Sequence, residues 1–159
     1  MEKAELEKII NYIIEQGALA IKSNTDEEQQ IAIDYVAIFS KNEDEFKKLE
    51  AVVESIGKEI DKETARTGKT FLLSEPLKSP VGPLFLIKIR KPDNTRPQRG
   101  APDFRVKNYQ EFKDKYLQSS GNFTLMIRKD YEMIEIKGID VLVYIPSKTL
   151  SERINLFDK

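Results

Sequence analysis

The chain has no cysteine, no histidine and no tryptophan among its 159 residues. Without cysteine and histidine it cannot form a disulfide, a Cys- or His-ligated zinc site, or a nucleophile activated by a histidine base. It also lacks the side chain whose ordinary pKa lies closest to neutral pH. These absences exclude zinc fingers, thioredoxin chemistry and histidine-based triads, so any site must be built from other side chains.

Long apolar runs are missing as well. No stretch approaches the roughly 18 apolar residues of a membrane-spanning helix. The N-terminal MEKAELEKII has the charge and spacing of a surface helix rather than of a secretory signal. We therefore expect a cytoplasmic protein that does not enter a membrane. The length and the 40% hydrophobic content predict one domain, 1–159, with a buried core.

The net charge of -1 hides an asymmetry between the two halves of the chain. Residues 1–64 hold 8 Lys or Arg and 16 Asp or Glu (net -8), whereas residues 65–159 hold 18 and 11 (net +7). The densest basic stretch contains Lys88, Arg90, Lys91, Arg96, Arg99, Arg105 and Lys107. Such a patch attracts anions. The pI near 5.7 is not that of a typical nucleic-acid-binding domain, so we do not expect nucleic acid as a partner.

Hydrophobic spacing predicts an N-terminal helix and then one order of elements that occurs twice. The first copy is a strand over 30–40, a helix that starts after Asn42, and strands over 58–63, 69–74 and 84–90. The second copy is a strand over 103–106, a helix over 107–117, and strands over 123–128, 131–137 and 141–145. Asn42 and Glu45 have the spacing of a capping box.

This pattern predicts an α+β fold that contains two tandem βαβββ modules. The predicted segments are an N-terminal helix (1–26), a first module (30–91), a linker (92–102), a second module (103–146) and a tail (147–159). The pattern alone leaves open a generic α+β sheet with helices on one face, such as a ferredoxin-like sandwich.

The strand over 84–90 carries the most informative polar residues. Lys88 and Arg90 alternate with apolar residues and therefore share one face. A lysine within an apolar strand needs a partner or access to water. This face is thus either an exposed outer surface or the lining of a cleft in which both cations meet an anion. The strand acids with a candidate functional role are Asp34, Asp103 and Glu135.

Four short motifs point to a known superfamily. They are Asp34-Tyr35-Val36-Ala37-Ile38, Gly68-Lys69-Thr70-Phe71-Leu72-Leu73 with Glu75-Pro76, Leu86-Ile87-Lys88-Ile89, and Arg96-Pro97 leading to Asp103-Phe104-Arg105-Val106. Together with the repeated βαβββ order they resemble the vicinal oxygen chelate superfamily of glyoxalases, ring-cleaving dioxygenases and bleomycin-resistance proteins. Within it, the chain resembles the YecM-type metal-binding family most. The resemblance extends over about residues 1–150.

The resemblance implies that the two modules form a curved mixed sheet around a cleft, in which His and Glu of active relatives bind a divalent metal. Here Tyr35, Lys88 and Asp103 stand where those ligands would be. Only Asp103 is a metal ligand by chemistry, and the Lys88 cation opposes a metal. We therefore predict no metal cofactor, and an ion pair between Lys88 and Asp103 in the former metal position. The predicted ligand-binding residues are Tyr35, Lys88, Arg90, Asp103 and Arg105.

These residues favour a metal-free protein that binds a small anionic molecule in the cleft, since arginine suits carboxylate and phosphate groups. One alternative is a metal-dependent lyase, isomerase or dioxygenase-type enzyme that recruits a divalent metal through Asp103 and Glu135, or one that uses Lys88 as a nucleophile or base. Another is a non-catalytic protein-interaction module. The residues leave open whether the protein is an enzyme. Superfamily members often pair modules between chains, which makes a homodimer a further expectation.

Overall fold

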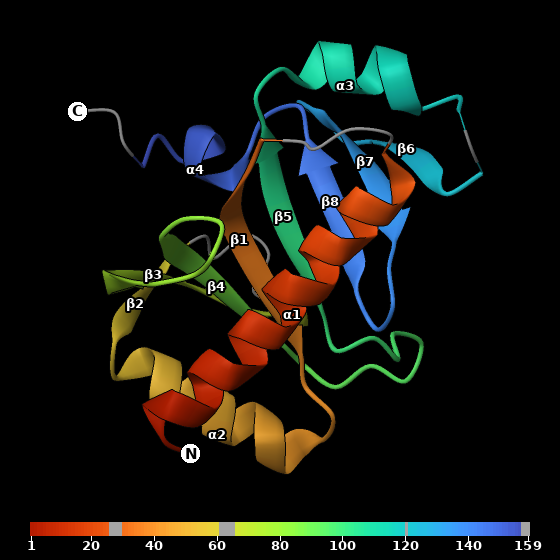
Figure 1. Ribbon diagram of the computed structural model, residues 1–159. Helices are drawn as coiled ribbons and strands as arrows, with labels where there is room; N and C mark the ends of the chain where they lie inside the picture. The colour runs from red at the N-terminus through yellow and green to blue at the C-terminus, as the bar shows by residue number, and fades with distance from the viewer. Residues whose placement is uncertain (26–29, 61–65, 120, 157–159) are drawn as a thin grey trace.

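The computed structural model describes residues 1–25, 30–60, 66–119 and 121–156, which fold as an α+β protein around one mixed sheet (Figure 1). The helices are α1 (Lys3–Asn24), α2 (Glu43–Glu54), α3 (Tyr109–Tyr116) and α4 (Leu150–Arg153). The strands are β1 (Ile31–Phe39), β2 (Gly57–Ile60), β3 (Gly68–Leu77), β4 (Leu84–Arg90), β5 (Gly100–Val106), β6 (Phe123–Ile127), β7 (Glu132–Lys137) and β8 (Leu142–Pro146). Within the described ranges, no helix is both long and apolar enough to cross a membrane.

The sheet has the strand order β2-β3-β4-β1-β5-β8-β7-β6. β1 pairs in parallel with β4, and β5 pairs in parallel with β8. The two central strands, β1 and β5, run antiparallel to each other. β1 therefore lies at the centre of the sheet. This position explains why its apolar residues continue on both faces.

The two faces of the sheet have different covers. Figure 1 shows α1 running diagonally across one face, in front of β1, β5 and β8. Gly17 of α1 lies against Pro102 and Phe104 of β5, on the face that holds the large core. Because side chains alternate along a strand, Ala101 and Asp103 point to the opposite face. That opposite face carries only a small apolar cluster, which includes Ala37, Phe39, Ala101 and Leu142.

Several predicted boundaries differ from the structure. The strand predicted over 103–106 begins at Gly100, so residues 100–102 of the predicted linker belong to the sheet and pair with β1. Glycine makes this pairing feasible, because a Cβ at position 100 would stand 2.4 Å from the Ala37 carbonyl oxygen. β3 continues to Leu77, past the predicted end at 74. Position 26 of the predicted N-terminal helix, positions 61–63 of the predicted strand and positions 157–159 of the tail lie outside the described residues.

The predicted start of α2 is correct, but the predicted capping box is only half formed. The Asn42 side chain accepts a hydrogen bond from the backbone N–H of Glu45 at 2.8 Å. The Glu45 carboxylate does not return to Asn42. It accepts from the Lys41 backbone N–H at 2.9 Å and binds Arg99, a residue 54 positions along the chain. A long-range ion pair therefore replaces the local contact that the spacing suggested.

Candidate functional site

A cavity of about 280 Å³ lies on the sheet face opposite α1. We call it the inner cavity. Its floor consists of Ala37 of β1 and Ala101 of β5, which are direct partners in the antiparallel pairing. Neighbouring positions on this face carry long side chains, among them Lys88, which is paired with Ala37, and Tyr144 of β8. The hollow exists because two of the smallest side chains meet at the centre of the sheet.

The wall of the inner cavity is strongly cationic. Five of the described side chains that line it are basic: Lys88, Arg90, Arg96, Arg128 and Arg153. Three tyrosines add polar hydroxyl groups and aromatic surface: Tyr35, Tyr131 and Tyr144. The remaining lining residues are Phe39, Met133 and Leu150 in addition to the two alanines of the floor and Asp103. The cavity therefore combines positive charge with an apolar interior, a combination that suits an organic anion.

Asp103 is the carboxyl group in this lining. Its residue is 7% exposed, and burial raises the pKa of Asp103 to about 8. The Arg153 guanidinium opposes this shift, and the Asp34 carboxylate adds to it. At neutral pH the Asp103 carboxyl thus retains its proton and acts as a hydrogen-bond donor. It adds almost no negative charge to the cavity at that pH.

Three of the four arginines in the wall, Arg90, Arg96 and Arg153, lie over aromatic rings. The Arg153 Cζ lies 4.0 Å from the Tyr131 ring centroid. The Cζ atoms of Arg90 and Arg96 lie 5.4 and 5.9 Å from the Phe39 ring centroid. Cation–π contacts of this kind orient a guanidinium and leave its N–H groups available for other partners.

Tyr144 connects the cavity wall to Glu135 of β7. The Tyr144 hydroxyl donates a hydrogen bond to Glu135 Oε2 at 3.0 Å. Burial and the Glu135 carboxylate together raise the pKa of Tyr144 to about 12, and Arg96 opposes the increase. Tyr144 is therefore a neutral donor at physiological pH. Glu135, a candidate functional acid from the sequence, holds Tyr144 and does not itself line the cavity.

A second, larger hollow adjoins the first. This outer basin has a volume of about 840 Å³ and is formed mainly by the loop 91–99. It shares Phe39, Arg90 and Arg96 with the inner cavity. Those three side chains therefore form the boundary between the two hollows.

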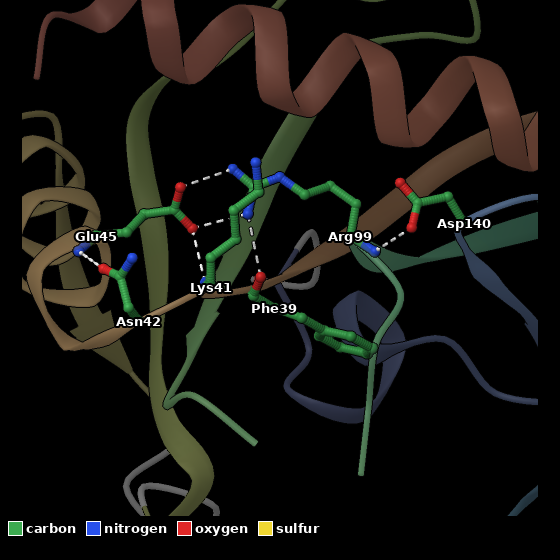
Figure 2. A network of polar contacts seen from close by, with 6 residues as sticks. All are labelled: Phe39, Lys41, Asn42, Glu45, Arg99 and Asp140. Carbon is green, nitrogen blue, oxygen red and sulfur yellow. Dashed lines mark hydrogen bonds and ion pairs between the residues drawn. The ribbon is translucent and has the colours of Figure 1, made fainter. Parts of the chain in front are cut away.

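Arg99 fixes the loop that carries Arg96. Figure 2 shows its guanidinium facing the Glu45 carboxylate, with bonds of 2.8 and 3.1 Å to the two oxygens. The same guanidinium donates to the Phe39 carbonyl oxygen at 3.1 Å, and the Arg99 backbone N–H donates to Asp140 Oδ1 at 3.1 Å. Burial raises the pKa of Glu45, but the hydrogen bonds from Arg99 and Lys41 outweigh it, and the resulting pKa is below the ordinary value. The loop is thereby tied to α2, β1 and the turn before β8.

The structure brings together four of the five predicted ligand-binding residues. Tyr35, Lys88, Arg90 and Asp103 all line the inner cavity. Lys88 and Asp103 lie on β4 and β5, on either side of β1. Because the Asp103 carboxyl is protonated near neutral pH, their predicted ion pair stays a prediction for pH values above about 8. Arg105 is placed elsewhere.

Arg105 does not line the inner cavity. Its guanidinium lies 3.7 Å from the Asp34 carboxylate and lines a different pocket of about 80 Å³. The register shift between Ile33 and Tyr35 turns Asp34 toward α4. There Asp34 accepts bonds from the Ser151 hydroxyl at 2.5 Å and from the Ser151 backbone N–H at 3.2 Å. Asp34, another candidate acid, thus anchors α4 over the end of the cavity.

Sequence reasoning did not nominate six of the polar or aromatic lining residues: Phe39, Arg96, Arg128, Tyr131, Tyr144 and Arg153. Tyr144 carried a usable signal, because it stands in the middle of an apolar strand just as Lys88 does. Arg96 belonged to the recognised basic stretch. Arg128 and Arg153 come from a turn and from the tail, where no periodicity predicts which way a side chain points.

A metal site does not fit the residues present. Among the described residues, no group of three or more Asp or Glu side chains is arranged to hold a metal ion. Tyr35, Lys88 and Asp103 line the inner cavity together with four arginines, and these cationic side chains repel a metal ion. We therefore derive no chemistry through a metal.

Comparison with known proteins supports the fold only. No family model matches the chain, and no curated protein matches it. A solved structure described as "Structural Genomics, Protein EC4020" is similar to this chain with a TM-score of 0.65 and 11% sequence identity. The similarity covers 98% of this chain and 93% of that one. At 11% sequence identity this similarity supports only the fold class, which is an α+β fold with a mixed sheet.

Proposed function

We propose that this chain is a metal-free protein of the vicinal oxygen chelate type, similar to the YecM-type family, that binds a small organic anion in the inner cavity. The observation that carries the proposal is the cavity lining, with five basic side chains and a buried Asp103 that is neutral near pH 7. A hollow of this charge and size favours a compact negatively charged ligand.

The arrangement of the strands supports the fold part of this proposal. In each half the chain runs strand, helix and three strands, from β1 to β4 and from β5 to β8. In the sheet, the first strand of each half lies at the centre and the second lies at the edge. Two tandem βαβββ modules that meet through their first strands would produce this order.

Ligand-dependent stabilisation tests the proposal. We expect the melting temperature to rise with small organic anions, because a ligand at about 100 times its dissociation constant adds roughly 2.7 kcal/mol to the free energy of unfolding. The panel contains small carboxylates, phosphates and divalent metals, each with and without a chelator. We expect the anion response to be insensitive to the chelator.

Two variants connect the response to the cavity. Ala101→Leu fills the floor and should abolish the stabilisation by anions while the protein still folds. Arg128→Gln removes one wall cation and should weaken it. Lys129→Gln is the matched control, because it removes the same charge from the exposed neighbouring position, outside the cavity.

An anion response that persists in Ala101→Leu would contradict the proposal. A metal-specific response that the chelator reverses would favour the metal-dependent enzyme instead, and no response at all would favour an interaction module.

A further inference from the structure

Arg90 and Arg96 form an unusual pair at the boundary between the inner cavity and the outer basin. Both guanidiniums lie over the same ring, that of Phe39. Arg90 comes from the end of β4, and Arg96 comes from the loop that follows it. Two positive groups on one small ring repel each other, so the pair forms an electrostatically unfavourable arrangement that an anion would relieve.

The groups that offset the charge of this pair are the Asp93 carboxylate and, near Arg90, Tyr35 and Tyr144. Burial lowers the pKa of Arg90, and the Arg96 charge lowers it further. Asp93 acts on both arginines, but its carboxylate lies 3.9 Å from Arg96 Nε. That carboxylate is exposed, and it accepts bonds from the Thr95 hydroxyl at 2.6 Å and the Thr95 backbone N–H at 2.9 Å. Asp93 therefore serves mainly to shape the loop.

The interior next to the pair is apolar. Phe39, which lies under both guanidiniums, is on β1 two positions from Ala37, the floor of the inner cavity. At about 3.3 Å per residue along a strand, the Cα of Ala37 lies about 7 Å from the Cα of Phe39. Met133 and Leu150 line the same hollow. A charged head at the pair would thus place an attached apolar body over Ala37 and Ala101.

We propose that Arg90 and Arg96 together bind the charged head of an organic monoanion whose compact apolar body occupies the inner cavity. This rests on the proposed function and specifies the ligand class of that same cavity. Two guanidinium forks hold one carboxylate or similar head by charge-assisted hydrogen bonds. The alanine floor and the cavity volume of about 280 Å³ leave room for a flat body such as a phenyl ring.

Benzoate is the probe that tests this proposal by calorimetric titration at constant ionic strength. We expect benzoate to bind about tenfold more tightly than acetate or inorganic phosphate, and benzyl alcohol to show no measurable binding. Arg90→Gln and Arg96→Gln should each weaken benzoate binding by about tenfold or more, because each removes a charge-assisted contact. Arg96→Lys should retain part of the affinity, since it keeps the charge but loses the planar fork.

Lys91→Gln is the matched control. Lys91 is an exposed neighbour of Arg90 that lines the outer basin but not the inner cavity, so its dissociation constant for benzoate should stay within about twofold of the wild-type value. Circular dichroism and melting temperature establish that each variant is folded.

The outcomes separate this inference from the proposed function. If benzoate binding is lost in Arg128→Gln and Ala101→Leu but retained in both Arg90→Gln and Arg96→Gln, the cavity binds anions and the arginine pair is not the anchor. If acetate or phosphate binds as tightly as benzoate, the apolar-body part is wrong while the proposed function stands. If none of the anions binds the wild-type protein, both proposals fail.

Discussion

Burial of Asp103 disfavours the charged form of its carboxyl group. Its pKa of about 8 in the folded protein exceeds the ordinary value of 3.8, so between these two values the folded state holds a proton that the unfolded state has lost. The free energy of unfolding should therefore fall with rising pH across this window, by up to about 1.4 kcal/mol per pH unit. Asp103→Asn, which is neutral at every pH, should remove this contribution and stabilise the protein at neutral pH.

Denaturant unfolding at several pH values between about 4 and 8 measures this dependence. Asp130→Asn is the control, because it removes a carboxylate from an exposed turn where burial is absent. Equal pH slopes for the wild type and Asp103→Asn would show that Asp103 ionises normally. The Asp103 carboxyl would then add a negative charge to the cavity at neutral pH.

At the scale of elements, the loop 91–99 depends on one ion pair with α2. The Arg99 and Glu45 side chains are only 10% and 18% exposed, and the pair is bidentate. We expect Arg99→Gln to lower the free energy of unfolding by about 2 kcal/mol, because it leaves the Glu45 carboxylate without its charged partner. Glu45→Gln should have a similar effect. Lys91→Gln, in the same loop and exposed, should change stability by less than about 0.5 kcal/mol.

A double-mutant cycle of Arg99→Gln and Glu45→Gln, measured by denaturant unfolding, isolates the interaction of the two side chains. We expect a coupling of about 1 kcal/mol or more. Strictly additive effects would mean that Arg99 stabilises the protein through the Phe39 carbonyl and Asp140 alone.

Local sequence patterns predict most of the helices and strands, and the features that they do not predict have physical causes. The strand over 84–90 was predicted with its observed ends, because apolar residues bounded by Pro83 and Pro92 define it. The ion pair of Glu45 and the turn of Asp34 toward α4 could not be predicted, because both depend on residues more than 50 positions away. Helix α4 is only four residues long, and it is held in place by that same Asp34.

At the scale of the whole molecule, the sequence indicates which residues are polar within apolar strands, but the sheet order decides which of them meet. Lys88 and Asp103 share a cavity because β4 and β5 both flank β1. Arg105 has the alternation that would place it beside Asp103, but it lies near Asp34 and lines a different pocket. Which pocket a side chain lines depends on the assembled fold, and the alternation of residues along a strand does not predict it.

Helix α1 joins the two halves of the sheet, since it contacts β1, β5, β7 and β8. Its closest approach is at Gly17, where a Cβ would lie 2.6 Å from Pro102 Cγ and 2.8 Å from Phe104 Cε2. Alanine is the better helix former by about 1 kcal/mol, so Gly17→Ala would stabilise a free helix. Here we expect it to lower the free energy of unfolding by about 1–3 kcal/mol, because the clash pushes α1 away from the core.

Ser23→Ala, exposed on the same helix, should change stability by less than about 0.5 kcal/mol. Thermal and denaturant unfolding of both variants measure this, and a Gly17→Ala protein as stable as the wild type would show that α1 does not need this close contact.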